Sequence, residues 1–352
     1  MELTATSTSP IEAAPTAPDR RVYFRGDGEP RSPSQIAAFL ASLPSIDPDS
    51  YSRGGFVAEL EAAFAEKLGK EAALFCPTGT LAQHLAVWKL CGDRPRALVQ
   101  ASGHIYNDTG DGLTRLCGIT MVPLGEGRPT FRADEVEAEL RRAATGRVVA
   151  PVGCVVVESP VRRAWGQCMP FEEMQAVAAL AREHGVGLHL DGARLFMMSA
   201  ATGIPGRDYC ALFDTVYVSL YKYFGAPFGA ILAGPSRLID GLYHERRMFG
   251  GGLPSAALAA AAALSGLAGF EERFAAAMVK GRELMVALGV EPFAHGSNIF
   301  PFRKNVDPAK LTERDVVVVP DAGAPFLPLA VNTTILRQSN EELLAAFAAA
   351  AP

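Results

Sequence analysis

Two hydrophobic patterns alternate along most of this chain. In the segment 59–69, Leu60 and Leu68 recur at helical spacing and Gly69 follows as a stop signal. The segment 154–159 (CVVVES) is instead a continuous apolar run, typical of a buried strand. Further strands are expected at 72–77, 96–102, 118–125, 186–193, 215–225 and 230–234, and further helices at 78–92, 107–116, 131–144 and 171–185. This alternation predicts an α/β fold with a mainly parallel sheet flanked by helices.

The pattern changes toward the C-terminus and predicts a division into domains. Residues 21–245 are expected to form a large domain, and an Ala-rich helix, short strands and a final helix in 246–352 predict a small α+β domain. Residues before about 45 join that small domain or cover the cleft. Residues 1–20, rich in Ser, Thr, Pro and Ala, are expected to be a disordered arm and not a signal peptide.

Composition and charge narrow the class of protein. The chain has 352 residues and a formal net charge of -5, so it carries no basic surface for nucleic acid or anionic membranes. Its 6 cysteines show no CxxC or Cys/His spacing, which argues against a metal site and for a reducing compartment. We therefore expect a cytoplasmic protein that binds neither metal nor membrane.

A lysine follows one of the predicted strands. In SLYKYFGAPFGA (219–230), Lys222 precedes a Gly-rich turn. A lysine that loses hydration there would have a lowered pKa, and its neutral amine could form a Schiff base with an aldehyde. For this segment alone, a solvated lysine at a strand end is an equally good interpretation. Ser219, at the start of the segment, is a further candidate contact for a ligand.

An aspartate and an arginine follow another strand, in HLDGARLF (189–196). Asp191 can hold a proton on a heteroaromatic nitrogen, as a pyridoxal-phosphate (PLP) ring requires when it accepts electrons. Arg194 can take a substrate carboxylate in its fork. An Asp-Gly turn beside a solvated arginine is the alternative for this segment alone.

Two more motifs complete the candidate site. Thr78, Gly79 and Thr80 stand between a strand and a helix, where free backbone amides and hydroxyls bind phosphate. His104, in ASGHIYND (101–108), can stack on a flat ring or act as an acid or base. All these motifs fall at carboxyl ends of strands, where α/β sheets place their functional residues.

Together these stretches resemble the threonine aldolase and β-eliminating lyase family of fold-type-I PLP enzymes, from about residue 23 to 252. The strings KEAALFCPTGTLAQ, HLDGARLF, SLYKYFGAPFGA and RRMFGGGL carry the resemblance. It implies that Lys222 holds PLP, that Asp191 faces the pyridine nitrogen, and that His104 stacks on the ring.

The resemblance assigns further contacts. Gly79 and Thr80 would bind the phosphate, and Arg194 the substrate carboxylate. Arg247 would be aimed at a phosphate or a neighbouring subunit, because the family has a basic residue there. The segment FRGDGEPR (24–31) matches the family's N-terminal motif, which places Asp27 and Gly28 near the substrate. A homodimer or homotetramer is also implied.

Three departures separate this chain from the family pattern. Tyr221 and Tyr223 flank Lys222 where the family has Ser and Gly, and ESPVRRAW (158–165) replaces a polar stretch. The family's carboxylate-binding arginine near the C-terminus is missing from PLAVNTT (328–334). The substrate therefore differs from threonine, or Arg163 or Arg303 substitutes. Loss of such a contact commonly costs a few kcal/mol of binding.

The reaction that follows is cleavage or formation of a β-hydroxy-α-amino acid, with glycine or another small amino acid and an aldehyde as products. His104 is the preferred base for the β-hydroxyl proton. An aminotransferase or a β-eliminating lyase acting on an unusual amino acid is an alternative. A non-catalytic homologue that binds PLP or a partner is another, although retention of Lys222, Asp191 and His104 argues against it.

Overall fold

A seven-stranded sheet forms the centre of the computed structural model, which describes residues 19–28, 32–43 and 45–352. The first eighteen residues of the expected N-terminal arm lie outside the described residues. The strand order is β2-β8-β7-β6-β5-β3-β4. The strands are β2 (Ala72–Cys76), β3 (Arg96–Gln100), β4 (Thr120–Leu124), β5 (Val152–Glu158), β6 (Gly187–Asp191), β7 (Thr215–Ser219) and β8 (Ala230–Gly234).

The pairing confirms a mainly parallel sheet of the fold-type-I kind. Neighbouring strands from β4 through β3, β5 and β6 to β7 are parallel, and β8 runs antiparallel to both β7 and β2. The predicted pair at 215–225 and 230–234 is therefore β7 and β8. Because β5, β6 and β7 are adjacent and parallel, their carboxyl ends meet at one edge of the sheet.

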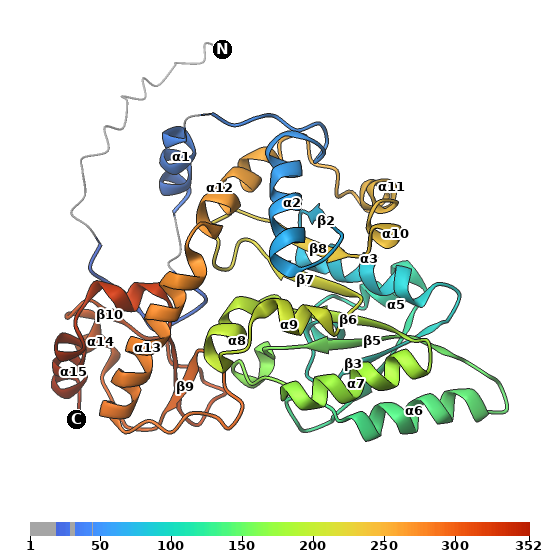
Figure 1. Ribbon diagram of the computed structural model, residues 1–352. Coiled ribbons are helices and arrows are strands. Elements are labelled where there is room, and N and C mark those ends of the chain that lie inside the picture. The colour runs from blue at the N-terminus through green and yellow to red at the C-terminus, as the bar shows by residue number, and fades with distance from the viewer. Residues whose placement is uncertain (1–18, 29–31, 44) are drawn as a thin grey trace, which may run out of the picture.

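Helices cover both faces of this sheet (Figure 1). Apolar side chains of α3, α4, α5, α10 and α11 pack on one face, and those of α2, α6, α7, α8, α9 and α12 on the other. The helix α2 ends at Gly69, whose φ of 65° is left-handed, as the sequence predicts. The helices of this part are α2 (Gly55–Leu68), α3 (Gly79–Cys91), α4 (His104–Asn107), α5 (Gly112–Cys117), α6 (Ala133–Thr145), α7 (Phe171–Glu183), α8 (Leu195–Thr202), α9 (Gly206–Ala211), α10 (Ser236–Ile239), α11 (Leu242–Met248) and α12 (Ala257–Leu267).

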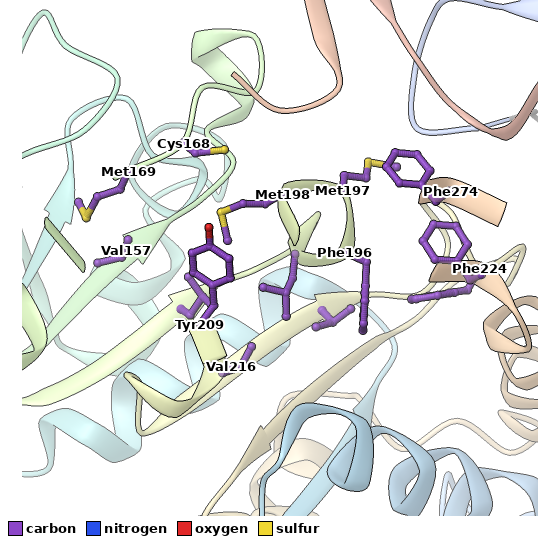
Figure 2. Close-up of a cluster of buried hydrophobic side chains, with 14 of the residues drawn as sticks. Val157, Cys168, Met169, Phe196, Met197, Met198, Tyr209, Val216, Phe224 and Phe274 are labelled. Atoms are coloured by element: carbon purple, nitrogen blue, oxygen red, sulfur yellow. The ribbon is translucent and has the colours of Figure 1, made fainter. Parts of the chain in front are cut away.

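An apolar cluster, called here the α8 cluster, joins the sheet to the C-terminal part (Figure 2). In it, the side chains of α8 lie between the strands and the long helix α13 (Phe270–Leu288). Its members are Val157, Cys168, Met169, Phe196, Met197, Met198, Tyr209, Val216, Phe224 and Phe274. The cluster fixes α8 directly behind the loop that follows β6.

The C-terminal part is built on two small sheets beside α13. β9 (Ile299–Phe302) pairs antiparallel with β11 (Leu327–Ala330). β1 (Val22–Tyr23) crosses from the N-terminus to pair in parallel with β10 (Val316–Val317). The remaining helices are α1 (Pro33–Ser42), α14 (Pro308–Thr312) and α15 (Asn340–Ala349), with short 3-10 turns at Arg162–Ala164 and Thr333–Arg337.

These contacts bear on the expected division near residue 245. β1 joins the C-terminal part, while α12, which follows that boundary, packs against α2 of the larger part. The two-domain division therefore stays a prediction, because β1 of the larger part packs with the smaller part and α12 of the smaller part packs with the larger part. No helix among the described residues is long and apolar enough to cross a bilayer.

Candidate active site

One cavity of about 750 Å³ lies at the carboxyl ends of β5, β6 and β7 and at the start of α3. Most of the residues predicted from separate motifs to form the site line this cavity: Asp27, Thr78, Gly79, Thr80, His104, Asp191, Arg194 and Lys222. Gly28 lies close by, since a Cβ added to it would be 4.0 Å from the carbonyl oxygen of Lys222. Ser219 is buried at the end of β7. Motifs far apart in the chain thus converge on one place.

The start of α3 forms the part of the cavity suited to an anion. Thr78 caps the helix by accepting a hydrogen bond from the backbone amide of Leu81 at 3.2 Å. At Gly79 an added Cβ would lie 2.0 Å from the hydroxyl oxygen of Tyr217, so only glycine fits there. The backbone amides at the first turn of α3 and the positive end of the helix dipole favour a phosphate at this point.

Lys222 and Asp191 face the same cavity from neighbouring strand ends. Burial, together with the charge of Arg194, lowers the pKa of Lys222 to about 8, while Asp191 acts in the opposite direction. Burial raises the pKa of Asp191, and the nearby charges of Lys222 and His104 oppose that rise. The amine is therefore more easily deprotonated than an ordinary lysine, which favours its reaction with a carbonyl.

A second buried carboxyl group, Glu158, stands next to Asp191 in register on β5. Its two oxygens accept hydrogen bonds from the backbone amides of His104 at 2.5 Å and Arg162 at 2.8 Å. Burial, and then the charge of Asp191, raises the pKa of Glu158 to about 7. Glu158 therefore fixes two loops that border the cavity. The sequence carried a signal for it, an acid at the last position of an apolar strand.

His104 belongs to a charged group at the mouth of the cavity. Its Nδ1 lies 3.2 Å from the carboxylate of Asp108, one helical turn further on. The same carboxylate accepts from Arg163 at 2.6 Å and from Arg162 at 3.2 Å. Hydrogen bonding from Arg163, and then from His104, lowers the pKa of Asp108 to about 2. Asp108 and Arg162 line the cavity, and neither was predicted.

Arg194 is held by Asp27 from the N-terminal segment. Its Nε and one terminal nitrogen donate to the two carboxylate oxygens at 2.5 and 2.9 Å. The fork that the sequence assigns to a substrate carboxylate is thus occupied by Asp27, and the nitrogen Nη1 is not part of this ion pair. This ion pair ties the segment after β1 to the loop after β6.

Three predicted arginines lie elsewhere in the structure. Arg247 is exposed on α11, with its guanidinium 4.5 Å above the ring of Tyr51, and is not among the residues that line the cavity. Arg303 lies over Phe326 at 5.4 Å. Arg163 is bound to Asp108 and faces a separate hollow. Within this chain, neither candidate substitute for the missing carboxylate ligand reaches the cavity.

The donor set fits PLP. The start of α3, with Thr78, Gly79 and Thr80 lining the cavity, suits the phosphate, and the buried carboxyl of Asp191 suits the ring nitrogen. Lys222, with its lowered pKa, supplies the amine. All three line the same cavity.

Comparisons with known proteins agree with this geometry. Residues 35–294 match the family model described as β-eliminating lyase. The chain is 29 % identical over 250 residues to low-specificity L-threonine aldolase 1 of Arabidopsis thaliana, covering 70 % of each chain. It is 34 % identical over 243 residues to aldolase vrtJ of Penicillium aethiopicum, covering 68 % of this chain and 61 % of that protein.

A solved structure extends the likeness to nearly the whole chain. It comes from Listeria monocytogenes and is provisionally assigned as an L-allo-threonine aldolase. The TM-score is 0.77 at 28 % identity, and the match covers 93 % of this chain and 95 % of that one. The likeness therefore includes the C-terminal part, which lies largely beyond the residues matched by the family model.

Proposed function

The chain belongs to the β-eliminating lyase family, and on that basis we propose that it cleaves or forms β-hydroxy-α-amino acids. It is a PLP-dependent lyase of fold type I, similar to threonine aldolases. The products of cleavage would be glycine or another small amino acid and an aldehyde. The observation that carries the proposal is the convergence of Lys222, Asp191 and His104 on one cavity beside the start of α3.

The cofactor contacts follow from the cavity. When bound, PLP supplies a carbonyl that an amine can attack and a ring that accepts electrons from the substrate. Lys222 would hold it covalently through a neutral amine, which its pKa of about 8 makes accessible. Asp191 would keep a proton on the ring nitrogen, while Thr78, Gly79 and Thr80 would hold the phosphate.

His104 is the proposed base for the β-hydroxyl proton of the substrate. Its Nδ1 faces Asp108, so that carboxylate would orient the ring and stabilise its protonated form after proton transfer. Glu158 would hold the backbone of His104 in place through its 2.5 Å hydrogen bond. Asp27 would position Arg194, whose Nη1 would remain for the substrate.

A panel of amino acids tests the reaction. The purified holoenzyme is incubated with several β-hydroxy-α-amino acids, and aldehyde, pyruvate, ammonia and α-keto acid are measured separately. Aldehyde release with a matching amount of glycine or small amino acid supports the proposal. An α-keto acid released together with ammonia would show β-elimination, an α-keto acid released without ammonia would show transamination, and binding without any product would show a non-catalytic homologue.

Assembly and location are proposed from the family and the composition. We propose a homodimer or homotetramer in which the exposed Arg247 faces a neighbouring subunit. A cytoplasmic location agrees with the six free cysteines. Light scattering of the purified protein, with Arg247→Glu as a variant, tests the assembly. A wild-type monomer would contradict it.

A further inference from the structure

One carboxylate at the mouth of the cavity faces more positive charge than it can neutralise. The carboxylate oxygens of Asp108 lie 2.6 Å from a guanidinium nitrogen of Arg163, 3.2 Å from one of Arg162 and 3.2 Å from the Nδ1 of His104. Two guanidinium groups are always protonated and outnumber this one carboxylate, while burial raises the pKa of the neighbouring Glu158 to about 7 and so favours its neutral form. A site with such an excess attracts an anion, and an amino-acid substrate carries one in its carboxylate.

The two arginines of this group differ in their freedom to bind a ligand. Arg163 holds both oxygens of Asp108, at 2.6 and 3.4 Å, and faces away from the cavity. Arg162 makes one longer contact with Asp108, lines the cavity, and has a side chain that is 58 % exposed. Its backbone amide is anchored to Glu158 at 2.8 Å. Arg162 therefore combines a fixed backbone with an accessible guanidinium group.

Arg162 also lines a second cavity of about 470 Å³, together with Gly26, Trp165 and Pro328. Arg162 therefore lies between the candidate active-site cavity and this second cavity.

We propose that Arg162 binds the carboxylate of the amino-acid substrate. This proposal rests on the proposed function and names the group that recognises its substrate class. A guanidinium pairs with a carboxylate through two parallel hydrogen bonds, and Arg162 can exchange its 3.2 Å contact with Asp108 for that pairing. Asp108 keeps Arg163 and His104 as partners, so substrate binding leaves the orientation of His104 intact.

The test compares amino acids with the amines that lack their carboxylate. Isothermal titration calorimetry measures the affinity of the holoenzyme for glycine, alanine and serine and for methylamine, ethylamine and ethanolamine. Arg162→Ala is expected to weaken the amino acids by about 10–100-fold, since a charge-assisted hydrogen bond is removed, and to leave the amines unchanged. Arg162→Lys should restore part of the loss. With a cleaved substrate, KM should rise while kcat changes little.

Arg303→Ala is the control. It should leave the affinity for amino acids within a factor of a few of the wild type. Loss of the preference for amino acids in this control, with Arg162→Ala unaffected, would overturn the assignment. So would a wild-type protein that binds amines as tightly as amino acids. Binding of amino acids without aldehyde release would contradict the proposed reaction, while the Arg162 variants would still decide the present question.

Discussion

The candidate active site and the α8 cluster are built from the same strands but have opposite chemistry. On β5, Val157 lies in the α8 cluster and the next residue, Glu158, lines the cavity. On β7, Val216 lies in the cluster and Tyr217 lines the cavity. Successive side chains of a strand point to opposite faces, so one residue separates the two regions.

The two regions are expected to contribute differently to the molecule. The α8 cluster buries apolar side chains, which stabilises the fold (Figure 2). The cavity buries the carboxyl groups of Glu158 and Asp191, and burial raises the pKa of both because it disfavours their charged forms. We infer that stability and chemistry can be changed separately, by substitutions on either side of the same strands.

A substitution in the α8 cluster should lower the stability of the fold and leave the catalytic activity of the folded protein unchanged. Phe274 is 1 % exposed on α13, and Phe274→Ala should lower the free energy of unfolding by about 3–5 kcal/mol. Denaturant unfolding measures this. Val279→Ala, on the exposed side of the same helix, is the control and should change little. If the folded fraction of Phe274→Ala lost most of its kcat/KM, the two regions would not be separable.

A substitution in the cavity should lower the catalytic activity without lowering the stability of the fold. Asp191→Asn removes the carboxylate that would keep a proton on the ring nitrogen of the cofactor, so kcat/KM should fall on the order of 10²–10³-fold. The free energy of unfolding of the apoprotein should stay the same or rise, because a buried ionisable group is lost. The amide can still accept the 3.1 Å hydrogen bond from the backbone of Ala193. Unchanged kcat/KM together with lower stability would assign Asp191 to the fold alone.

The smallest expected effect is a pH dependence of cofactor attachment, which the cavity should show and the apolar α8 cluster should not influence. Attachment needs the neutral amine of Lys222, whose pKa is lowered to about 8 by burial. The rate of attachment to the apoprotein should therefore rise about tenfold per pH unit below that value and level off above it. Stopped-flow absorbance measures the rate. A rise that continues to pH 10 would indicate an ordinary lysine.

Much of this architecture could be predicted from the sequence because its signals are local. A strand followed by a polar motif and a turn identifies Lys222 and Asp191 as residues at a sheet edge, whatever the strand order. The structure then brings them together with His104 and Gly79 in one cavity. Four such motifs in family order predicted the cofactor as well.

The parts that were not predicted depend on long-range register. Glu158 becomes important because β5 pairs with β6 in parallel and places it beside Asp191, and the apolar run before it contains no information on that pairing. The contact of Arg162 with Asp108 joins residues 54 positions apart. The exposed position of Arg247 likewise depends on how α11 packs on α3.

The central claim is that Lys222 carries PLP. Borohydride reduction of the holoenzyme, followed by proteolysis and mass spectrometry, tests it most directly. We expect the reduced cofactor on the peptide that contains Lys222, and neither a modified peptide nor a bound chromophore in Lys222→Ala. A reduced cofactor found on another lysine, or a borohydride-reducible chromophore that survives in Lys222→Ala, would contradict the account.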